Sequence, residues 1–347
     1  MSVGSRFARP PEQSEKHRPR YNLEVSQGFT EGIKAMKIAM IGTGQIAQRH
    51  LKAFQQIQDA RIVGHVGTSQ AKADAAAETW GGRGYTRLDD LLRREQPEAV
   101  WITVPPHQHG ALEYRLLNDN LPFLVEKPLS ADRKTADSIG EAIARKNTLV
   151  AVGYNWRALD TLPRLRAALA HNPARMVIGQ FHVNTPSAVW WRHQAESGGQ
   201  FVEQATHLLD LTRALIGDGT LVCAQASTFD RPAFPDADIP GVSAALVRFT
   251  GDVVGVFSAT CILAKGGSVQ LQLICEGGTI TLNRSAVTYQ TGDSEVVDAA
   301  QVDSYEAQNR AFINAIQQNK PDLIFSTYAD ALKTHHLCHD IAEQSGG

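Results

Sequence analysis

The sequence predicts an α/β protein of two domains, the first built on a doubly wound parallel sheet and the second on a large, mostly antiparallel open sheet. The chain has 347 residues, which is longer than a single hydrophobic core usually organises. From Met36 to Gly153, short apolar runs alternate with helical patterns, which is typical of a parallel sheet with crossover helices. Beyond Gly153, strand-like runs follow one another with few helices between them. We therefore expect domains at 36–153 and 154–347, preceded by an extension over 1–35.

The first domain is expected to alternate strands and helices throughout. Its strands are expected at 37–41, 61–66, 99–104, 123–125 and 149–152. Its helices are expected directly after Gly44 and at 70–79, 88–95, 110–118 and 131–146, where apolar residues recur at helical spacing. Because a helix follows each strand, right-handed crossovers should place neighbouring strands parallel.

The second domain is expected to contain mainly hairpins. Helices are expected at 162–170 and 201–216. Strands are expected at 176–183, 221–228, 244–249, 253–262, 269–275, 279–282 and 287–290. The connections Thr250-Gly251-Asp252 and Glu276-Gly277-Gly278 favour hairpin turns, which predicts antiparallel pairing. Two terminal helices, at 305–318 and 327–342, should return to cover the domain junction.

Composition argues against several classes of protein. Apolar residues make up 43% of the chain, charged residues 20%, and the formal net charge is −2. A nucleic-acid-binding protein normally has a basic balance, so we expect no nucleic-acid partner. No apolar run approaches the ~18 residues that a membrane span needs. The four cysteines are scattered, which is typical of reduced thiols, and we expect a cytoplasmic location without membrane association.

The extension over 1–35 is polar and rich in proline near its middle. It lacks the continuous apolar segment of a signal peptide. One interpretation is a disordered tail or an upstream start of the reading frame, since Met36 directly precedes the first strand. The other is an arm that wraps around a partner subunit.

A glycine motif follows the first strand and opens the first helix: Gly42-Thr43-Gly44-Gln45-Ile46-Ala47, of the form G-x-G-x-x-A. The first glycine allows a tight turn, and the second lets the backbone approach a pyrophosphate. The small Ala47 permits close packing of helix on strand, and the free N–H groups of the helix N-terminus bind the anion. This context predicts a dinucleotide-binding site that includes Gly42, Thr43, Gly44, Gln45 and Ile46, with NAD or NADP as cofactor.

The end of the second strand bears on the choice between these two cofactors. An acidic residue there would accept hydrogen bonds from both ribose hydroxyls of NAD. The chain instead has Gly67-Thr68-Ser69, followed by Lys72. Small hydroxyls and a cation suit a 2′-phosphate, so the pattern favours NADP. The alternative is that Lys72 is a solvated helix residue and that NAD binds.

Three further motifs accompany the glycine motif: Pro105-Pro106-His107-Gln108-His109, Glu126-Lys127-Pro128, and GGQFVEQATH at 198–207. Together the four motifs resemble the Gfo/Idh/MocA family (glucose–fructose oxidoreductase, inositol dehydrogenase and rhizopine-catabolism proteins) over the chain from about Met36 onward. The resemblance implies a Rossmann domain followed by an open-sheet domain whose outer face commonly makes homo-oligomer contacts, here a homodimer or homotetramer. It also implies hydride transfer between nicotinamide and a carbon of a sugar, cyclitol or related polyol.

The resemblance assigns roles to individual residues. Lys127 matches the lysine that contacts both nicotinamide and substrate, and His207 matches the catalytic histidine. Glu203 stands where the family often has Asp, and Gly67 departs from the commonest acidic position. We also expect the cofactor to contact Val104, Pro105 and Glu126, which lie at or just beyond strand ends. His109, which matches a family position near the cofactor, is expected to contact it as well.

The residues also support these roles independently of any resemblance. Lys127 follows an apolar strand, at the edge of a doubly wound sheet where ligands bind. Glu203 and His207 lie four apart on an expected helix and so share a face, which suggests that Glu203 orients the histidine. The same spacing could hold a metal, but no third ligand stands at a matching position, and we expect none.

Substrate contacts are expected from Lys127 and His207 and from residues on two connecting segments. Tyr154 and Arg157 follow the last strand of the first domain, and Trp191 precedes the Gly198-Gly199 loop. Aromatic faces and arginine donors suit a polyhydroxylated ring, although a tryptophan here could equally be packing. Two other functions remain open, namely transient oxidation that enables elimination or glycoside cleavage, and a ligand sensor without catalysis.

Overall fold

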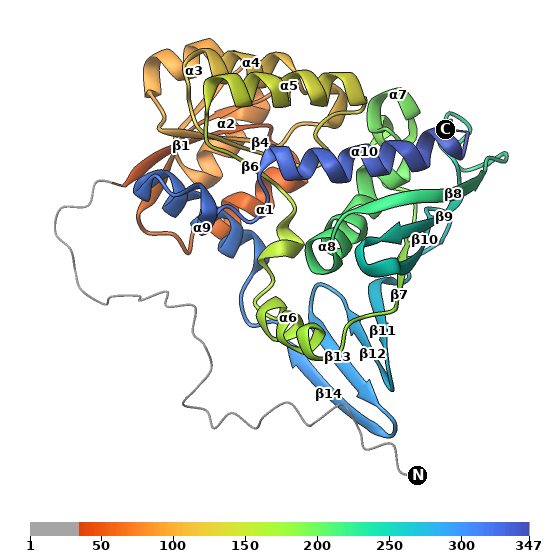
Figure 1. Cartoon of the computed structure of the whole chain (residues 1–347). Helices are drawn as coiled ribbons and strands as arrows, with labels where there is room; N and C mark the ends of the chain where they lie inside the picture. The colour runs from red at the N-terminus through yellow and green to blue at the C-terminus, as the bar shows by residue number, and fades with distance from the viewer. Residues whose placement is uncertain (1–34, 347) are drawn as a thin grey trace, which may run out of the picture.

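The computed structural model describes residues 35–346. Residues 1–34 of the expected extension therefore lie outside the described residues. Within the described part, two sheets form separate layers, with the parallel sheet and its helices at the top of Figure 1 and the larger sheet below it.

The first sheet has six strands in the order β3-β2-β1-β4-β5-β6, and every adjacent pair is parallel. Its strands are β1 (Met36–Ile41), β2 (Ala60–Val66), β3 (Arg83–Tyr85), β4 (Ala99–Ile102), β5 (Phe123–Val125) and β6 (Val150–Val152). Its helices are α1 (Gln45–Phe54), α2 (Gln70–Trp80), α3 (Leu88–Glu95), α4 (Ala111–Asn118) and α5 (Arg133–Lys146). This order is that of a dinucleotide-binding Rossmann domain, and it confirms the expected doubly wound sheet.

The second sheet has eight strands in the order β14-β13-β12-β11-β7-β10-β9-β8. Its strands are β7 (Met176–His182), β8 (Gly219–Ser227), β9 (Val242–Phe249), β10 (Val253–Thr260), β11 (Val269–Cys275), β12 (Gly278–Leu282), β13 (Ala286–Thr291) and β14 (Ser294–Ala299). Strands β7 and β10 pair in parallel, and the other neighbours pair antiparallel, as expected. One face packs on α6 (Leu162–His171) and α8 (Thr206–Ile216) through a continuous apolar core.

Both terminal helices return to the first domain. Helix α9 (Ser304–Gln318) inserts Phe312 and Ile313 into the apolar cluster beneath β1, where Phe312 meets Trp101 edge to face. Helix α10 (Tyr328–Gln344) runs between α5 and α8 and contributes to the cores of both domains (Figure 1). The C-terminal segment therefore joins the two domains, as the sequence predicts.

Three local features differ from the expected elements. Strand β4 ends at Ile102 instead of residue 104, and the Thr103 N–H and hydroxyl both donate to the Ile41 carbonyl just beyond its end. Strands β3 and β14 were not expected. Residues 201–205, expected as α-helix, form a π-helical turn that follows a short helix, α7 (Gln194–Ser197), and the Gly198–Gly199 loop, and that continues directly into α8.

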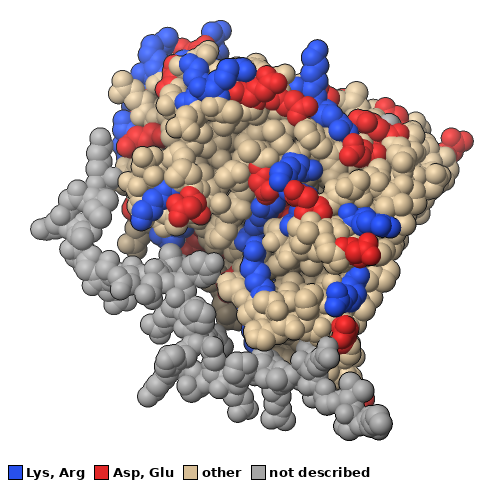
Figure 2. All heavy atoms as spheres, viewed as in Figure 1, with Lys and Arg blue, Asp and Glu red and all other residues tan. Residues whose placement is uncertain are grey.

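Acidic and basic side chains lie close together over much of the face shown in Figure 2. Among the helices of residues 35–346, none is both long enough and apolar enough to cross a membrane.

Candidate active site

The glycine loop joins β1 to α1 with one packed side and one open side. Gly42 has φ +102°, and a Cβ there would lie 2.7 Å from the Thr103 carbonyl oxygen, so glycine is required. Gly44 precedes α1, and a Cβ there would meet no described atom within 4 Å. The first turn of α1, which begins at Gln45 and Ile46, contains no acidic residue, so the positive end of the helix dipole is not offset locally. Together with Thr43, this loop fits a dinucleotide pyrophosphate.

The residues expected to distinguish NAD from NADP lie together at the start of α2. The Ser69 hydroxyl caps the helix by accepting the Lys72 N–H at 3.3 Å, and Lys72 Nζ lies 3.4 Å from the Thr68 hydroxyl. All three side chains are exposed. At Gly67 a Cβ would lie 3.1 Å from the backbone nitrogen of Ala73, so an acidic side chain would crowd α2. Close packing of strand on helix thus accounts for the missing carboxylate.

The end of β4 places Val104 and Pro105 half-buried beside the glycine loop. His109 follows, and its Nδ1 hydrogen-bonds to the carboxylate of Glu113, whose other oxygen accepts the Gly110 N–H at 2.6 Å. Both His109 and Glu113 are buried. The carboxylate fixes the ring, and Nε2 is the nitrogen that His109 retains for another partner.

Glu126 directly follows β5 and faces a buried network. Its Oε1 lies 2.9 Å from His50 Nε2, and its Oε2 accepts the backbone N–H of Lys127 at 3.1 Å. His50 Nδ1 lies 2.8 Å from Asn309 Oδ1, which also accepts the Trp101 indole N–H at 2.9 Å. Glu126 is therefore occupied within the protein, and it positions the residue that follows it.

Two donors in this network share one acceptor. Trp101 can only donate, so the atom of Asn309 that faces it is the carbonyl oxygen. His50 Nδ1 therefore donates to the same oxygen. These contacts fix the ring of His50, whose Nε2 faces the Glu126 carboxylate at 2.9 Å.

Lys127 links the two domains through an ion pair. Its Nζ lies 2.7 Å from Glu203 Oε1 and donates to the Glu203 carbonyl oxygen, also at 2.7 Å. The second carboxylate oxygen of Glu203 accepts the Trp191 indole N–H at 2.6 Å. The Lys127 and Glu203 side chains are 11% and 14% exposed, so the pair is shielded yet reachable from solvent. Trp191 itself is buried and, in this arrangement, holds Glu203.

His207 opens α8 immediately after the π-helical turn. Its ring meets Tyr154 edge-on and stacks at 22° on Trp156, with centroids 6.0 Å away in both cases. The residue is partly exposed, whereas its Nδ1 is buried and has no hydrogen-bond partner within residues 35–346. Burial, followed by the charges of Lys127 and Arg284, holds the pKa of His207 well below its usual 6.5. The imidazole is therefore neutral at neutral pH and can accept a proton.

The structure changes the role expected for Glu203. Its carboxylate does not orient His207, because Lys127 and Trp191 occupy its two oxygens. The Lys127 amine and the Trp191 indole N–H are both hydrogen-bonded to this carboxylate. Among the described residues, no hydrogen bond joins the carboxylate to the His207 ring. Glu203 is thus a positioning residue for Lys127.

Two residues expected to contact substrate are engaged elsewhere. The Tyr154 hydroxyl lies 2.7 Å from the Thr206 hydroxyl, and burial raises the tyrosine pKa well above its usual value. Arg157 forms a two-pronged pair with Asp210 at 2.6 and 2.7 Å and a second pair with Asp330 at 2.6 Å. The guanidinium thus ties the linker to α8 and α10, and we do not retain Arg157 in the substrate set.

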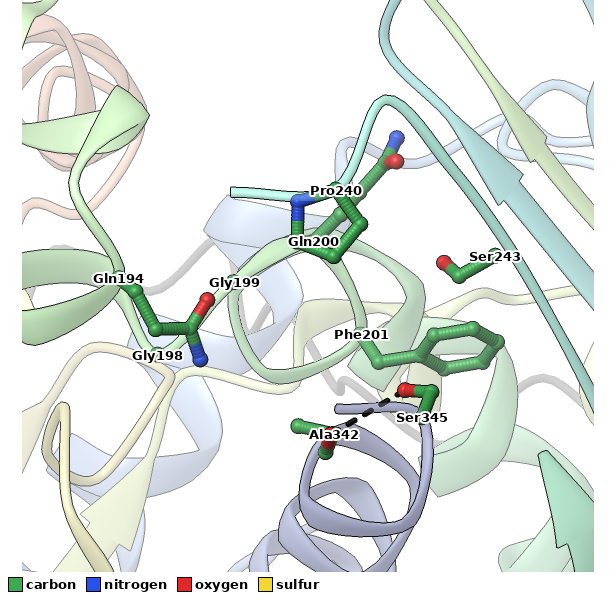
Figure 3. A pocket seen from close by; sticks show the side chains of 9 residues that line it. All are labelled: Gln194, Gly198, Gly199, Gln200, Phe201, Pro240, Ser243, Ala342 and Ser345. Carbon is green, nitrogen blue, oxygen red and sulfur yellow. Dashed lines mark hydrogen bonds between the residues drawn. The ribbon is translucent and has the colours of Figure 1, made fainter. Parts of the chain in front are cut away.

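A small cavity lies behind the Gly198–Gly199 loop and is shown in Figure 3. It is lined by Gln194, Gly198, Gly199, Gln200, Phe201, Pro240, Ser243, Ala342 and Ser345. Its volume of about 20 Å³ admits one water molecule and excludes a sugar ring. None of Lys127, Glu203 and His207 lines it, so it is separate from the site described above.

Comparison with known proteins assigns the family. Residues 36–154 match the model of the oxidoreductase family with an NAD-binding Rossmann fold, and residues 173–281 match the Gfo/Idh/MocA C-terminal domain. The chain belongs to the Gfo/Idh/MocA family.

Relatives within this family include two named dehydrogenases. The chain is 26% identical to glucose-6-phosphate 3-dehydrogenase of Bacillus subtilis (strain 168), over 50% of this chain and 52% of that one. It is 27% identical to inositol 2-dehydrogenase of Rhizobium meliloti (strain 1021), over 62% of this chain and 66% of that one. The alignments thus span about half to two thirds of these relatives.

Solved structures show the same fold at lower identity. A 3-ketoreductase from Actinomadura kijaniata, in complex with NADP and TDP-benzene, has a TM-score of 0.79 at 18% identity and covers 89% of this chain and 98% of that one. UDP-N-acetylglucosamine 3-dehydrogenase from Acidithiobacillus ferrooxidans has a TM-score of 0.76 at 18% identity, over 89% and 97%. At this identity the likeness concerns the fold.

Three residues at the family site were not identified from the sequence. His50 lies on the apolar face of α1 and reads as a core residue. Asn309 belongs to no motif, and its partners are 208 and 259 residues away. Arg284 lies in a turn and differs from other surface arginines only by its position in the fold. No cluster of three possible metal-ligating side chains occurs among residues 35–346.

Proposed function

We propose that this protein is an NAD(P)-dependent dehydrogenase or reductase that acts on a hydroxyl-bearing carbon of a sugar, cyclitol or related polyol. The observation that carries the proposal is the presence of a neutral, partly exposed His207 and an ion-paired Lys127 at the carboxyl edge of a dinucleotide-binding sheet. The two named relatives are dehydrogenases of a sugar phosphate and of inositol, which supports this substrate class.

The proposed mechanism gives each residue one task. His207 accepts the hydroxyl proton of the substrate, since its depressed pKa keeps a lone pair available. Lys127 donates a hydrogen bond to the oxygen on which negative charge develops. Glu203 and Trp191 hold Lys127 in place, and Glu126 fixes its backbone. A nicotinamide cofactor held by the glycine loop would supply the hydride acceptor for the same carbon.

We propose a preference for NADP over NAD. The hydroxyls of Thr68 and Ser69 and the amine of Lys72 lie together and exposed at the start of α2, where an adenosine 2′-phosphate would be placed. The remaining cofactor contacts are proposed from the glycine loop, from Val104 and Pro105, and from His109. A preference for NADH that survives Lys72→Ala would contradict this assignment.

We also propose a homo-oligomer, dimer or tetramer, that assembles through the outer face of the second sheet. Val222 on β8 and Val254 on β10 are exposed there, 49% and 39% respectively. Light scattering of the purified protein tests this: a double substitution Val222→Lys and Val254→Lys should yield monomers. A monomeric parent would contradict the assembly.

The experiment for the activity is a screen of aldoses, sugar phosphates and inositols with both cofactors, followed by nicotinamide absorbance. We expect net reduction with at least one of these compounds and its loss in His207→Ala. Substrate conversion without net nicotinamide reduction would instead favour elimination or glycoside cleavage by transient oxidation. Tight sugar binding without conversion would favour the sensor.

A further inference from the structure

Arg284 occupies the short turn between β12 and β13, at the rim of the active site. The turn is stiffened by Asn283, whose side-chain oxygen accepts the N–H groups of Ser285 at 2.8 Å and Ala286 at 3.0 Å. Arg284 is exposed. Its backbone is therefore held by local hydrogen bonds, and its guanidinium projects from a fixed position.

The guanidinium has no acidic partner among residues 35–346. No carboxylate lies within 4 Å of it, and it makes no hydrogen bond to a described group. The guanidinium lies over the ring of Tyr305, with Cζ 5.9 Å from the ring centroid. Lys127, by contrast, is neutralised by Glu203 at 2.7 Å. Arg284 thus contributes an uncompensated positive charge.

A chain of side-chain contacts connects Arg284 to the residues beside Lys127. The Tyr305 ring, over which Arg284 lies, meets the His50 ring edge-on with centroids 5.0 Å apart, and His50 hydrogen-bonds Glu126 beside Lys127. Burial, the charge of Lys127 and then the charge of Arg284 hold the pKa of His207 well below its usual value. Arg284 therefore lies against Tyr305, in the same cluster of contacts as His50, Glu126 and Lys127.

A second cation acts on the same ring from the first domain. Arg49, on α1, is exposed and has no ion pair among the described residues. Burial raises the pKa of Tyr305, and the charges of Arg284 and Arg49 both oppose that rise. Uncompensated cations from two domains near one ring attract an anion into the space they face. The planar guanidinium suits phosphate and carboxylate, which it can bind through two parallel hydrogen bonds.

We propose that Arg284 forms a subsite for an anionic group, phosphate or carboxylate, carried by the substrate of the dehydrogenase site. The proposal rests on the proposed function, which places the reacting hydroxyl at His207 and Lys127. A neutral sugar would leave the guanidinium solvated and would gain no binding affinity from its charge. Arg284 thus selects substrates by charge, whereas the catalytic pair acts on the hydroxyl.

Calorimetric titration of the protein with bound NADPH tests the subsite without requiring turnover. The probes are glucose, glucose 6-phosphate and glucuronate, which share a ring and differ in charge. We expect at least one anionic probe to bind roughly tenfold more tightly than glucose, because one charge-assisted hydrogen-bonded pair contributes about that gain in affinity. Arg284→Gln should reduce this preference to less than about threefold, and Arg284→Lys should retain part of it.

The matched control is Arg94→Gln, which removes the same charge from an exposed arginine on α3. It should leave the preference unchanged, and inorganic phosphate should compete with the anionic probe in the parent but not in Arg284→Gln. Equal affinities for charged and neutral probes in the parent, or an undiminished preference in Arg284→Gln, would overturn the subsite. A failed dehydrogenase assay with an Arg284-dependent preference would instead reject the reaction and keep the subsite.

Discussion

The two walls of the active site differ in how completely their polar groups are paired. On the wall from the first domain, both oxygens of Glu126 are hydrogen-bonded and His109 is held by Glu113. On the wall from the second domain, His207 Nδ1 is buried without a partner among residues 35–346, and Arg284 has no carboxylate beside it. The carboxylates named on the first wall already have protein partners, whereas His207 and Arg284 on the second have bonding capacity left for a ligand.

This difference separates two tasks. Groups that are fully paired keep their geometry whether or not a ligand is bound, which suits a wall that holds a cofactor and a lysine in register. An unpaired polar group is costly when buried and gains when a ligand pairs it. We infer that the first domain supplies a fixed frame for the chemistry and that the second domain recognises the substrate.

The Lys127–Glu203 pair joins the two walls, and removing it should have the largest effect. Lys127→Ala removes the donor that faces the developing negative charge, so turnover should fall by about 10²–10³. NADPH binding should change little, because the glycine loop and the start of α1 provide the pyrophosphate contacts. Exposed Lys146, at the end of α5, gives the control Lys146→Ala. Steady-state kinetics and fluorescence titration measure both quantities, and near-normal turnover would remove Lys127 from the mechanism.

Acid should destabilise the protein through two buried imidazoles on α10. Burial lowers the pKa of His335 to about 3 and that of His339 to about 4, from 6.5. The folded state thus binds fewer protons than the unfolded state below pH 6.5, and stability is lost as pH falls from there towards these values. The loss should be about 1.4 kcal/mol for each imidazole per pH unit.

Urea unfolding at several pH values measures this loss. The double variant His335→Gln and His339→Gln should flatten the dependence between about pH 6.5 and 5, relative to the parent. The same slope in both proteins would show that other groups cause it.

Interrupting the paired wall should reduce stability. Asn309→Ala leaves Trp101 Nε1 and His50 Nδ1 without their common acceptor, in a region where all three residues are buried. The free energy of unfolding should fall by about 1–3 kcal/mol. Asn118→Ala, at an exposed position at the end of α4, is the control. Equal stability of the two variants would mean that the network is not needed to maintain this wall.

The smallest effect is expected at the tryptophan that holds Glu203. Trp191→Phe keeps an aromatic ring but removes the N–H that donates to Glu203 at 2.6 Å. Turnover should fall about fivefold, because loss of this hydrogen bond should raise the activation free energy by about 1 kcal/mol. Half-buried Trp190 offers the neighbouring control Trp190→Phe, whose turnover should match the parent. If both variants behave alike, the hydrogen bond to Glu203 has no role.

Local patterns predicted the fold well where they extended over several residues. The glycine motif and the alternation that follows it predicted the parallel sheet, and the turns at Gly251 and Gly277 predicted the hairpins. Strand β3 has three residues, and β14 is largely polar and exposed at a sheet edge, so neither shows an apolar pattern. The π-helical turn at 201–205 differs from an α-helix by one hydrogen-bond step, which side-chain periodicity does not reveal.

The site was harder to predict because its pairings are distant in the sequence. Motifs indicated Lys127, Glu203 and His207, yet the partner of Glu203 depends on which charge lies nearest in space. Arg157 and Asp210 are 53 residues apart, and their ion pair takes up an arginine that the sequence offered for the substrate. Sequence spacing gives a shared face on one helix, whereas these contacts arise between elements.

The most direct test of the account is the pH dependence of polyol oxidation by the parent and by His207→Ala. Because burial and the charges of Lys127 and Arg284 depress the pKa of His207, parent activity should persist in acid below pH 6.5. His207→Ala should bind NADPH normally and lose at least about a hundredfold in turnover, the contribution of a general base. A variant that keeps its turnover with an unchanged pH profile would contradict the account and place the base elsewhere.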